Sequence, residues 1–156
     1  MSLDYSQMGP RILYWVCRMI PTSNDCYRIP NYDRYRIGIK KVFNAMTFAE
    51  KPVTRYPKGV KQMFKEDIRF QEVSDAIRKY HSGIAHKFYI GIGHYLQYLE
   101  SQILINVLLE LKDLGIHALP IHDAEVGGRA WVDMSKELME QVFLDMTNVE
   151  SWVQVE

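Results

Sequence analysis

The strongest constraint on the fold of this chain is a predicted helix followed at once by a strand in its second half. Apolar residues recur at spacings of three and four over residues 94–114, which predicts a long amphipathic helix. Gly115 comes next, at the position where a glycine commonly ends a helix. Residues 116–121 are then apolar and predict a strand. The pattern indicates a fold that combines helices with a sheet.

The remaining segments extend this pattern to an α+β fold. A hairpin tip at His122-Asp123 leads into a return strand that runs to about residue 132. At the other end of the chain, residues 3–8 predict a short strand that stops near an acidic residue. Further helices are predicted over 34–50, 65–81 and 135–146. This order fits a small antiparallel sheet with helices on one face.

Length and composition fit one globular domain. The chain has 156 residues, 47% apolar and 24% charged, so we treat 1–156 as a single domain with its own core. No apolar run approaches the roughly 20 residues that span a bilayer, and a signal peptide is not indicated. Cys17 and Cys26 are too few for a disulfide framework or a zinc site. We therefore expect a cytoplasmic protein with no membrane partner.

The charges are separated along the chain although the net charge is zero. Residues 28–69 hold eleven Lys and Arg against four Asp and Glu, a net of +7. Residues 98–156 hold three against eleven, a net of −8. One interpretation is a basic part that meets phosphates and an acidic part that binds metal. The other is a pair of solvated faces that balance each other.

Asp4 and Asp123 each end an apolar segment that predicts a strand. On adjacent strands, two such carboxylates could hold two Mg²⁺ ions roughly 3.5–4 Å apart, as phosphoryl transfer requires. Simpler explanations exist for each residue alone. An aspartate at a hairpin tip is commonly a turn former, and residues near a chain start are commonly solvated.

Four side chains follow one another at a spacing of four residues: Arg36, Lys40, Asn44 and Phe48. On a helix this spacing places the four side chains along one face. Two cations could hold phosphates, and an aromatic ring two turns further along could stack on a base. The alternatives are a solvated basic face and a phenylalanine that belongs to the core.

Taken in order, three segments resemble the polymerase motifs of family A DNA polymerases and of phage-type single-subunit RNA polymerases. Asp4-Tyr5-Ser6-Gln7-Met8 is similar to motif A, and His122-Asp123-Ala124-Glu125 is similar to motif C. The segment from Arg36 to Phe48 is similar to motif B, although Asn44 replaces its central aromatic residue. The similarity extends over about residues 3–147.

The resemblance implies a palm-like sheet, in which the motif A strand pairs with the motif C hairpin, and a reduced fingers-like helical insertion over 28–93. The implied activity is template-dependent nucleotidyl transfer, as in phage or plasmid DNA replication, with a DNA template and primer, nucleoside triphosphates and two Mg²⁺ ions. A thumb or upstream domains could belong to a longer native chain. The implied metal ligands are Asp4, Asp123 and the carbonyl of Tyr5. Nucleotide contacts are implied for Arg36, Lys40, Asn44 and Phe48, and supporting roles for His122 and Glu125.

Gly9 bears on the choice of sugar. The DNA polymerases carry a glutamate there that crowds the 2′ position of the incoming nucleotide, whereas glycine leaves that position open. Phe48 also lacks the hydroxyl that a tyrosine would offer to ribose. We therefore expect an active form to accept both nucleotide types with a preference below about 100-fold, or roughly 2.7 kcal/mol.

Two alternatives to an active polymerase remain open at this level. One is a non-catalytic, replication-associated module that binds nucleic acid and keeps a degenerate polymerase fold. The other is an unrelated α+β interaction domain whose acidic half, residues 98–156, binds a basic partner. Metal binding at the paired aspartates distinguishes the enzyme from both alternatives.

Overall fold

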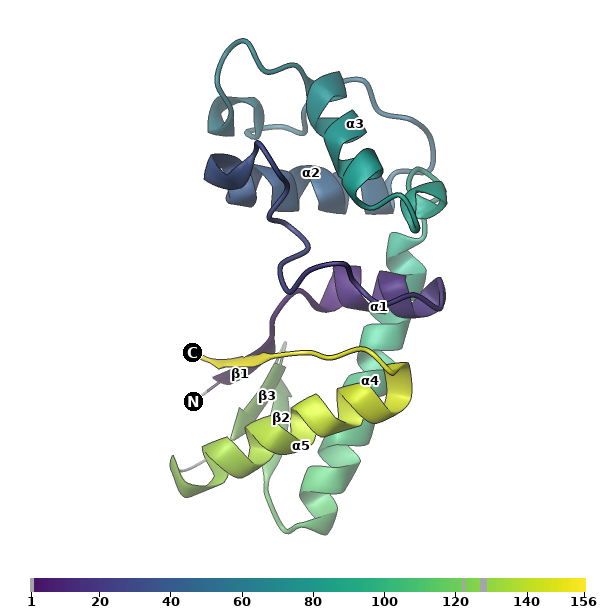
Figure 1. Cartoon of the computed structure of the whole chain (residues 1–156). Coiled ribbons are helices and arrows are strands. Elements are labelled where there is room, and N and C mark those ends of the chain that lie inside the picture. Colours follow the sequence, from purple (N-terminus) through teal and green to yellow (C-terminus); the bar gives the residue numbers. More distant parts are fainter. Residues whose placement is uncertain (1, 122, 127–128) are drawn as a thin grey trace. The chain divides into compact units, whose positions relative to one another are not determined.

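The computed structural model describes residues 2–121, 123–126 and 129–156, and the side chains among these that lie outside 119–130 (Figure 1). The chain forms two compact units. Unit 1 consists of Met1–Pro21 with Gln97–Glu156, and unit 2 consists of Thr22–Leu96. In the described part of the chain, five α-helices accompany one small antiparallel sheet, so the α+β class is confirmed. None of the described helices has the length and hydropathy needed to cross a bilayer.

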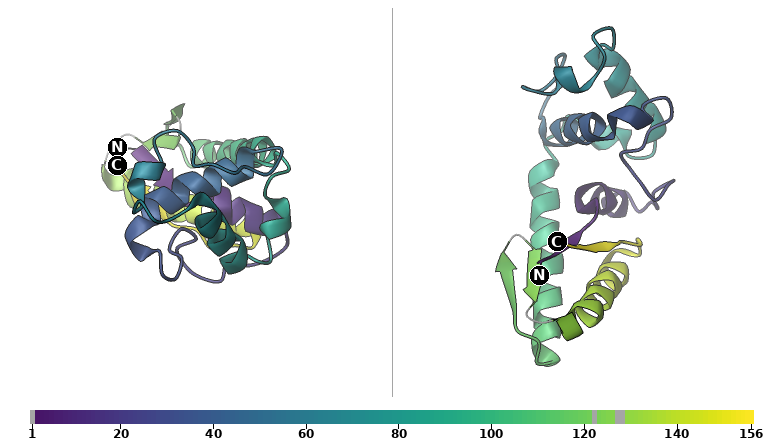
Figure 2. Two further views of the ribbon diagram at one scale, coloured as in Figure 1. Left: turned by 90° about the horizontal axis from the view of Figure 1, so that it is seen from above. Right: turned by 90° about the vertical axis from the view of Figure 1, so that its left-hand side faces the viewer.

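Unit 1 contains the sheet. Its strands are β1 (Ser2–Tyr5), β2 (Ala118–Ile121), β3 (Asp123–Val126) and β4 (Val153–Val155). They lie in the order β2-β3-β1-β4, and every neighbouring pair is antiparallel. The two chain ends therefore lie side by side (Figures 1 and 2), joined by hydrogen bonds of 3.1 and 2.9 Å between the backbones of Ser2 and Glu156.

Three helices accompany the sheet of unit 1: α1 (Met8–Val16), α4 (Gly93–Asp113), which continues from unit 2, and α5 (Arg129–Thr147). Helix α5 lies along one side of the strands (Figure 2) and packs on β3 and β4. Leu3 and Tyr5 alternate with Asp4 and are buried, as expected for a strand with one face in the core. The Tyr5 hydroxyl donates to the Met139 carbonyl at 2.6 Å, which fixes α5 to β1.

Unit 2 is built from helices and loops. Its main elements are α2 (Arg36–Phe48) and α3 (Phe70–Tyr80), with the short 3₁₀ helices η1 (Asp33–Tyr35), η2 (Lys61–Met63) and η3 (Ala85–Lys87). The buried Phe43 ring makes edge-to-face contacts with the rings of Tyr27, His81 and Phe88. Aromatic packing of this kind replaces a sheet as the organising core of the unit.

Several predicted elements occur with shifted bounds. The strand expected over 3–8 ends at Tyr5, because Gln7 takes a left-handed conformation (φ 58°) and α1 begins directly after it. The return strand ends at Val126 instead of near 132, and α5 begins at Arg129 instead of 135. Gly127 and Gly128, which follow β3 in the sequence, lie outside the described residues. The long helix is confirmed as α4, and Gly115 after it has a positive φ of 75°.

Two helices of unit 2 begin later in the sequence than predicted, and one strand was not predicted. The helix expected from Lys65 begins at Phe70, where Arg69 and Glu72 form a capping box. The helix expected from Arg34 begins at Arg36 after the η1 turn, and no side chain caps its first residues. Strand β4 was not predicted, since it is only three residues long and pairs with β1 at the opposite end of the chain.

Candidate functional site

The backbone of β1 lies beside that of β3, although 119 positions separate Asp4 from Asp123 in the sequence. The register pairs Ser2 with Glu125 and Leu3 with Ala124. Asp4 and Asp123 are each the next residue beyond the Leu3–Ala124 pair. Continued by one residue, this register sets their two backbone positions opposite each other. The expected pairing of the N-terminal strand with the hairpin is therefore present, and the assignment of the two segments to polymerase motifs stays a prediction.

The side chains of the motif C segment lie outside the described part of the structure. This applies to the roles assigned to Asp123 and Glu125, whose backbones are described, and to His122 as a whole. Within the described residues, no group of three or more His, Cys, Asp and Glu side chains is arranged to hold a metal ion. The distance between the carboxylates of Asp4 and Asp123 stays a prediction.

Asp4 lines a cavity of about 350 Å³ in unit 1. The other polar side chains around this cavity come from one stretch of α4: Gln97, Glu100 and Ser101. The apolar wall includes Met8 and Met139. The cavity size falls within the range of small-ligand sites, and its polar atoms are mainly oxygens. Oxygen ligands are those that Mg²⁺ prefers, but among the described residues only two carboxylates line this cavity, so a magnesium site at Asp4 stays a prediction.

Tyr5 follows Asp4, and its side chain makes its described contacts with α5. Its hydroxyl is hydrogen-bonded to α5, and its ring packs on Phe143 with centroids 5.4 Å apart. Burial, together with the nearby charge of Glu140, raises the pKa of Tyr5 far above its ordinary value. The phenol thus stays neutral and anchors β1. Only its backbone carbonyl remains as the metal ligand that the resemblance implies.

The α2 face expected from the spacing of four is present in unit 2. Lys40 and Asn44 are exposed, and Phe48 is 39% exposed at the end of the helix. The neighbouring positions Ile39 and Phe43 are buried, so the opposite face of α2 forms the core. The role of Lys40 in holding a triphosphate stays a prediction.

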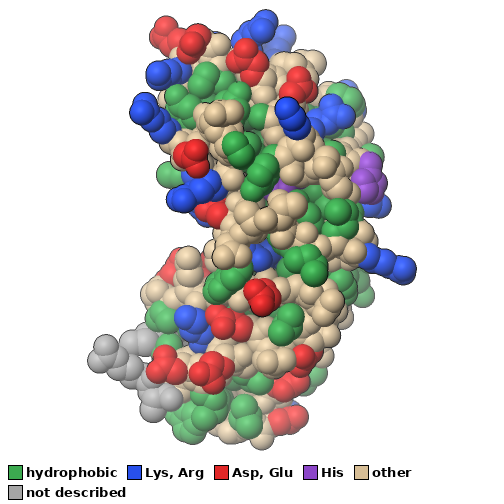
Figure 3. Space-filling model, in the orientation of Figure 1, with side chains coloured by type: hydrophobic (Ala, Val, Ile, Leu, Met, Phe, Trp, Pro, Cys, Tyr) green, Lys and Arg blue, Asp and Glu red, His purple; other side chains and the backbone are tan. Residues whose placement is uncertain are grey.

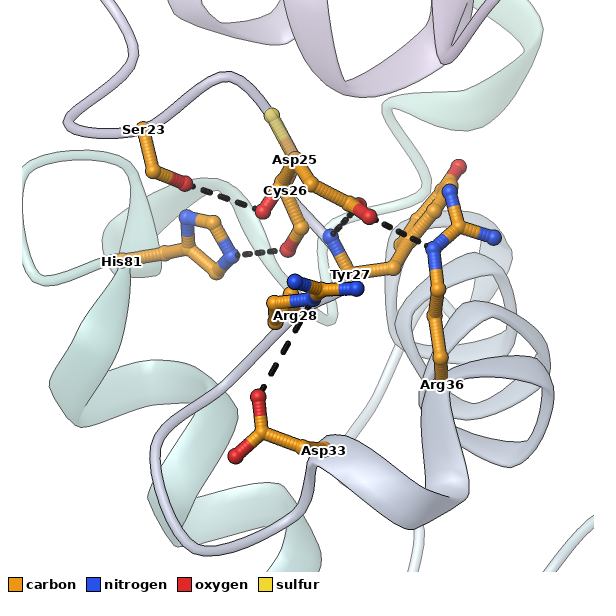
Figure 4. Close-up of polar contacts among 8 residues, drawn as sticks. All are labelled: Ser23, Asp25, Cys26, Tyr27, Arg28, Asp33, Arg36 and His81. Carbon is orange, nitrogen blue, oxygen red and sulfur yellow. Dashed lines mark hydrogen bonds and ion pairs between the residues drawn. The ribbon is translucent and has the colours of Figure 1, made fainter.

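Arg36, the first residue of that face, has a partner within unit 2 (Figure 4). Its Nε donates to Oδ2 of Asp25 at 2.6 Å, and its guanidinium carbon lies 5.6 Å from the ring centroid of Tyr27. The Tyr27 backbone N–H donates to Oδ1 of Asp25 at 3.0 Å. Burial raises the pKa of Asp25, but the hydrogen bonds from Arg36 and Tyr27 and the charges of Arg36 and Arg28 outweigh burial and hold it below its ordinary value.

Phe48 also has a packing role in unit 2. Its ring contacts the His94 ring at 5.5 Å in an edge-to-face arrangement. It also lies against Gly93, where an added Cβ would approach Cδ1 of Phe48 to 2.4 Å. The glycine therefore makes room for the ring. A part of the ring remains exposed, so packing and stacking on a base both remain possible for this side chain.

Asp25 and Glu100 are the residues of interest that the sequence did not reveal. Neither belongs to a motif or a helical spacing that points to a partner. Asp25 lies in a loop rich in turn formers, and Glu100 lies on a helix whose apolar stripe attracts attention first. A weak signal for Asp25 was present, since its segment precedes a basic helix.

Compared with protein-family models, with curated proteins and with solved structures, the chain gives no match.

Proposed function

We propose that the chain is a template-dependent nucleotidyl transferase core similar to the palm of a family A polymerase. In this proposal Asp4 and Asp123 hold Mg²⁺ together with the Tyr5 carbonyl. Lys40 and Arg36 bind the triphosphate, and Asn44 and Phe48 contact the nucleotide. Glu125 and His122 support the metal site. A DNA template and primer complete the set of partners, and the cytoplasm is the expected compartment.

One observation carries the proposal. Strand β1 pairs with β3 in a register that leads directly to Asp4 and Asp123, and their segments come from opposite ends of the chain. A turn-forming aspartate at a hairpin tip has no reason to lie beside a second acidic position on the neighbouring strand. Like charges on adjacent positions destabilise a sheet unless a cation or a proton compensates for them. The cavity beside Asp4 adds room for such a ligand.

The chemistry follows from these ligands. When bound, Mg²⁺ would supply a Lewis acid that neutralises charge on the phosphate oxygens. The residues of the chain hold the metal, orient the triphosphate and add positive charge where negative charge develops. Lys40 can act as a point charge in this way because its ammonium is exposed on α2.

Arg36 favours a second candidate function. A triphosphate would compete with Asp25 for the Arg36 guanidinium, which already holds a short ion pair. Unit 2 is also strongly basic, with fourteen Lys and Arg against seven Asp and Glu. A non-catalytic, replication-associated module that binds nucleic acid through this unit would need neither a metal nor a triphosphate.

Primer extension with the full chain tests the proposal. We expect Mg²⁺-dependent addition of nucleotides to a primed DNA template. Asp4→Asn and Asp123→Asn should each lower the rate by on the order of 10²–10³-fold or more, since each removes a charge that compensates the transition state. Asp133→Asn is the matched control, because Asp133 is an exposed acid on α5.

Metal binding separates the two candidates. Calorimetry with Mg²⁺ or Mn²⁺ should show binding to the wild type that Asp4→Asn abolishes and Asp133→Asn preserves. Metal-independent binding of DNA, unchanged in the Asp4 variant, would favour the non-catalytic module and reject the enzyme.

A further inference from the structure

A second cavity of unit 1, of about 490 Å³, is lined by α5 and by the segment that leads into β4. Glu137 and Glu140 line it from α5, one turn apart, and Glu150 lines it from the segment. Among the described side chains, no cation forms an ion pair with any of these three carboxylates. Three acidic groups around one concave space favour a cationic ligand.

Hydrogen bonding distinguishes this cavity from a loose acidic surface. Oε1 of Glu140 accepts from the Val153 backbone N–H at 2.9 Å, which holds that carboxylate in place. Ser151 also lines the cavity and is only 7% exposed. Its Oγ has no hydrogen-bond partner among the described residues. A buried hydroxyl without a partner is costly, so a ligand that brings an N–H donor would gain a hydrogen bond at Ser151.

Trp152 supplies an aromatic wall and indicates which cation fits. The guanidinium carbon of Arg11 lies 4.2 Å from the centroid of its ring, so this indole already stacks on one guanidinium. Trp152 lines the cavity and is 37% exposed, which leaves part of the side chain open to a second group. Arginine combines stacking on an aromatic ring with forked hydrogen bonds to carboxylates, whereas lysine is a point charge.

We propose that this cavity binds an arginine side chain presented by a basic segment of a partner protein. In the complex the guanidinium lies against Trp152 and donates to the carboxylates of Glu137 and Glu150. The charge of Arg11 opposes a second cation, but the three carboxylates carry more charge than one guanidinium. The acidic excess of unit 1, twelve Asp and Glu against five Lys and Arg, attracts a basic segment toward it. Binding requires neither Mg²⁺ nor a nucleotide, so it is independent of the proposed function.

Two rival explanations make different predictions. In the first, the acidic face of α5 is only solvated, and a basic peptide is attracted by the charge of unit 1 as a whole. Individual carboxylates then matter no more than other exposed acids. In the second, the occupant is another copy of this chain, because unit 2 is as strongly basic as unit 1 is acidic. The chain would then self-associate.

Calorimetry with blocked tetra-arginine, tetra-lysine and tetra-glutamate peptides tests the proposal on the full chain. We expect tetra-arginine to bind, tetra-lysine to bind at least about threefold more weakly, and tetra-glutamate not to bind. Glu137→Gln combined with Glu150→Gln should weaken the binding of tetra-arginine about tenfold, as expected for the loss of two ion pairs. Glu140 is left unchanged because it also holds the backbone of β4.

The matched control removes the same charge from elsewhere in unit 1. Asp113→Asn combined with Asp133→Asn neutralises two exposed acids that do not line the cavity, and it should leave the affinity within about twofold of the wild type. Trp152→Leu tests the stacking. It should abolish the preference for arginine over lysine, whereas a tryptophan retained only for packing would lower the melting temperature and leave that ratio unchanged.

Three results would overturn the inference. Equal weakening by the two double variants would assign binding to the overall charge of unit 1. Failure to bind tetra-arginine, or equal affinity for tetra-lysine, would remove the arginine site. Sedimentation of the chain alone tests the remaining rival: self-association that Glu137→Gln combined with Glu150→Gln abolishes would make a second copy the occupant. None of these results bears on the metal site, so the proposed function is tested separately.

Discussion

In unit 1 the candidate aspartates lie on hydrogen-bonded neighbouring strands, whereas in unit 2 the candidate cations lie along the exposed face of one helix. The two arrangements depend on different parts of the chain. The strand pair needs a register between segments at opposite ends of the sequence. The helix face needs only thirteen consecutive residues, from Arg36 to Phe48, in helical conformation. Long-range pairing positions the acids, and local periodicity positions the cations.

The units also differ in charge and core. Unit 1 carries five Lys and Arg against twelve Asp and Glu, a net of −7, and unit 2 carries the opposite net of +7. The space-filling view shows Asp and Glu predominating over unit 1 on that face, while Lys and Arg are frequent over unit 2 (Figure 3). Unit 1 packs a helix on a sheet, and unit 2 packs aromatic rings around Phe43. Such a division suits a metal-binding part and a phosphate-binding part.

Matched core truncations should have the largest effects. Phe143 is the one phenylalanine in the sequence of unit 1, Phe43 is the most buried of those in unit 2, and they are 0% and 1% exposed. Each change to alanine should cost about 3–5 kcal/mol, because it removes a ring and leaves a cavity. Hydrogen exchange should show lost protection mainly in the unit that carries the change. Equal loss in both units would mean that they unfold as one cooperative unit and have no separate cores.

A pair of helical glycines should give intermediate effects of opposite sign. Gly93→Ala places a methyl group 2.4 Å from Cδ1 of Phe48 and should cost about 1–3 kcal/mol through overpacking. Gly9→Ala meets its nearest atom only at 3.9 Å and should stabilise by about 0.5–1 kcal/mol through helix propensity. Urea denaturation measures both. Destabilisation by the Gly9 change would show that the space beside Glu100 is needed for the fold.

Acid should weaken unit 2 through His81. This side chain is 1% exposed, and its Nε2 is hydrogen-bonded to the Cys26 carbonyl at 2.8 Å (Figure 4). Burial lowers the pKa of His81 below its ordinary value of 6.5, although the hydrogen bond opposes the shift. Below pH 6.5 the unfolded chain then takes up a proton that the folded chain does not, so stability falls as the pH drops toward the folded pKa.

Unfolding of the full chain at pH 7.5 and pH 5.5 measures this effect. His81→Gln keeps an amide donor for the Cys26 carbonyl and should reduce the difference between the two pH values. An unchanged difference in that variant would assign the pH dependence to other groups.

Asp25 should act at lower pH and with a smaller effect. Its pKa lies below the ordinary value of 3.8, and its carboxylate is partly exposed. Its contribution is therefore present above that value and is lost as the pH falls through the folded pKa. Asp25→Asn should destabilise by at most about 1 kcal/mol at pH 7, since the ion pair is screened by solvent. If Arg36 binds a triphosphate, the same variant should bind nucleotide more tightly, because the competing carboxylate charge is gone.

The sequence predicted the parts of this fold that depend on local periodicity or on residues that end helices and form turns. Helix α4 with its glycine and the exposed face of α2 follow from the spacing of residues, and the pairing of β2 with β3 follows from their alternation with turn residues. The adjacency of β1 and β3 came from the resemblance between their acidic ends and two polymerase motifs, and not from the strands themselves. Strand β4 and the Asp25–Arg36 ion pair were not predicted. A three-residue strand and a loop carboxylate have no sequence pattern that identifies their partners, which are set by the folded chain.

The same contrast explains the candidate site. The spacing of Arg36, Lys40 and Phe48 correctly indicated a shared helix, yet it could not show that Asp25 binds the first of them or that Gly93 accommodates the last. The position of Glu100 beside Gly9 could not be predicted for a similar reason. Its proximity to Gly9 arises from the packing of α1 near α4, and the two residues are 91 positions apart.

The smallest effect on stability and the most informative effect on binding should come from Lys40. Lys40 and Lys41 are both exposed on α2, but one residue of helix rotates Lys41 by about 100° away from the face shared with Asn44 and Phe48. Each change to alanine should alter stability by less than about 0.5 kcal/mol, as for other exposed positions.

Lys40→Ala should weaken the binding of Mg²⁺–ATP about tenfold, or about 1.4 kcal/mol. Lys41→Ala should leave it nearly unchanged, because only Lys40 shares the face of the predicted nucleotide contacts. Equal weakening by both variants would show that the basic unit attracts phosphate through its overall charge, and the motif B assignment would then fail. A large loss of stability in the Lys40 variant would instead make that lysine structural.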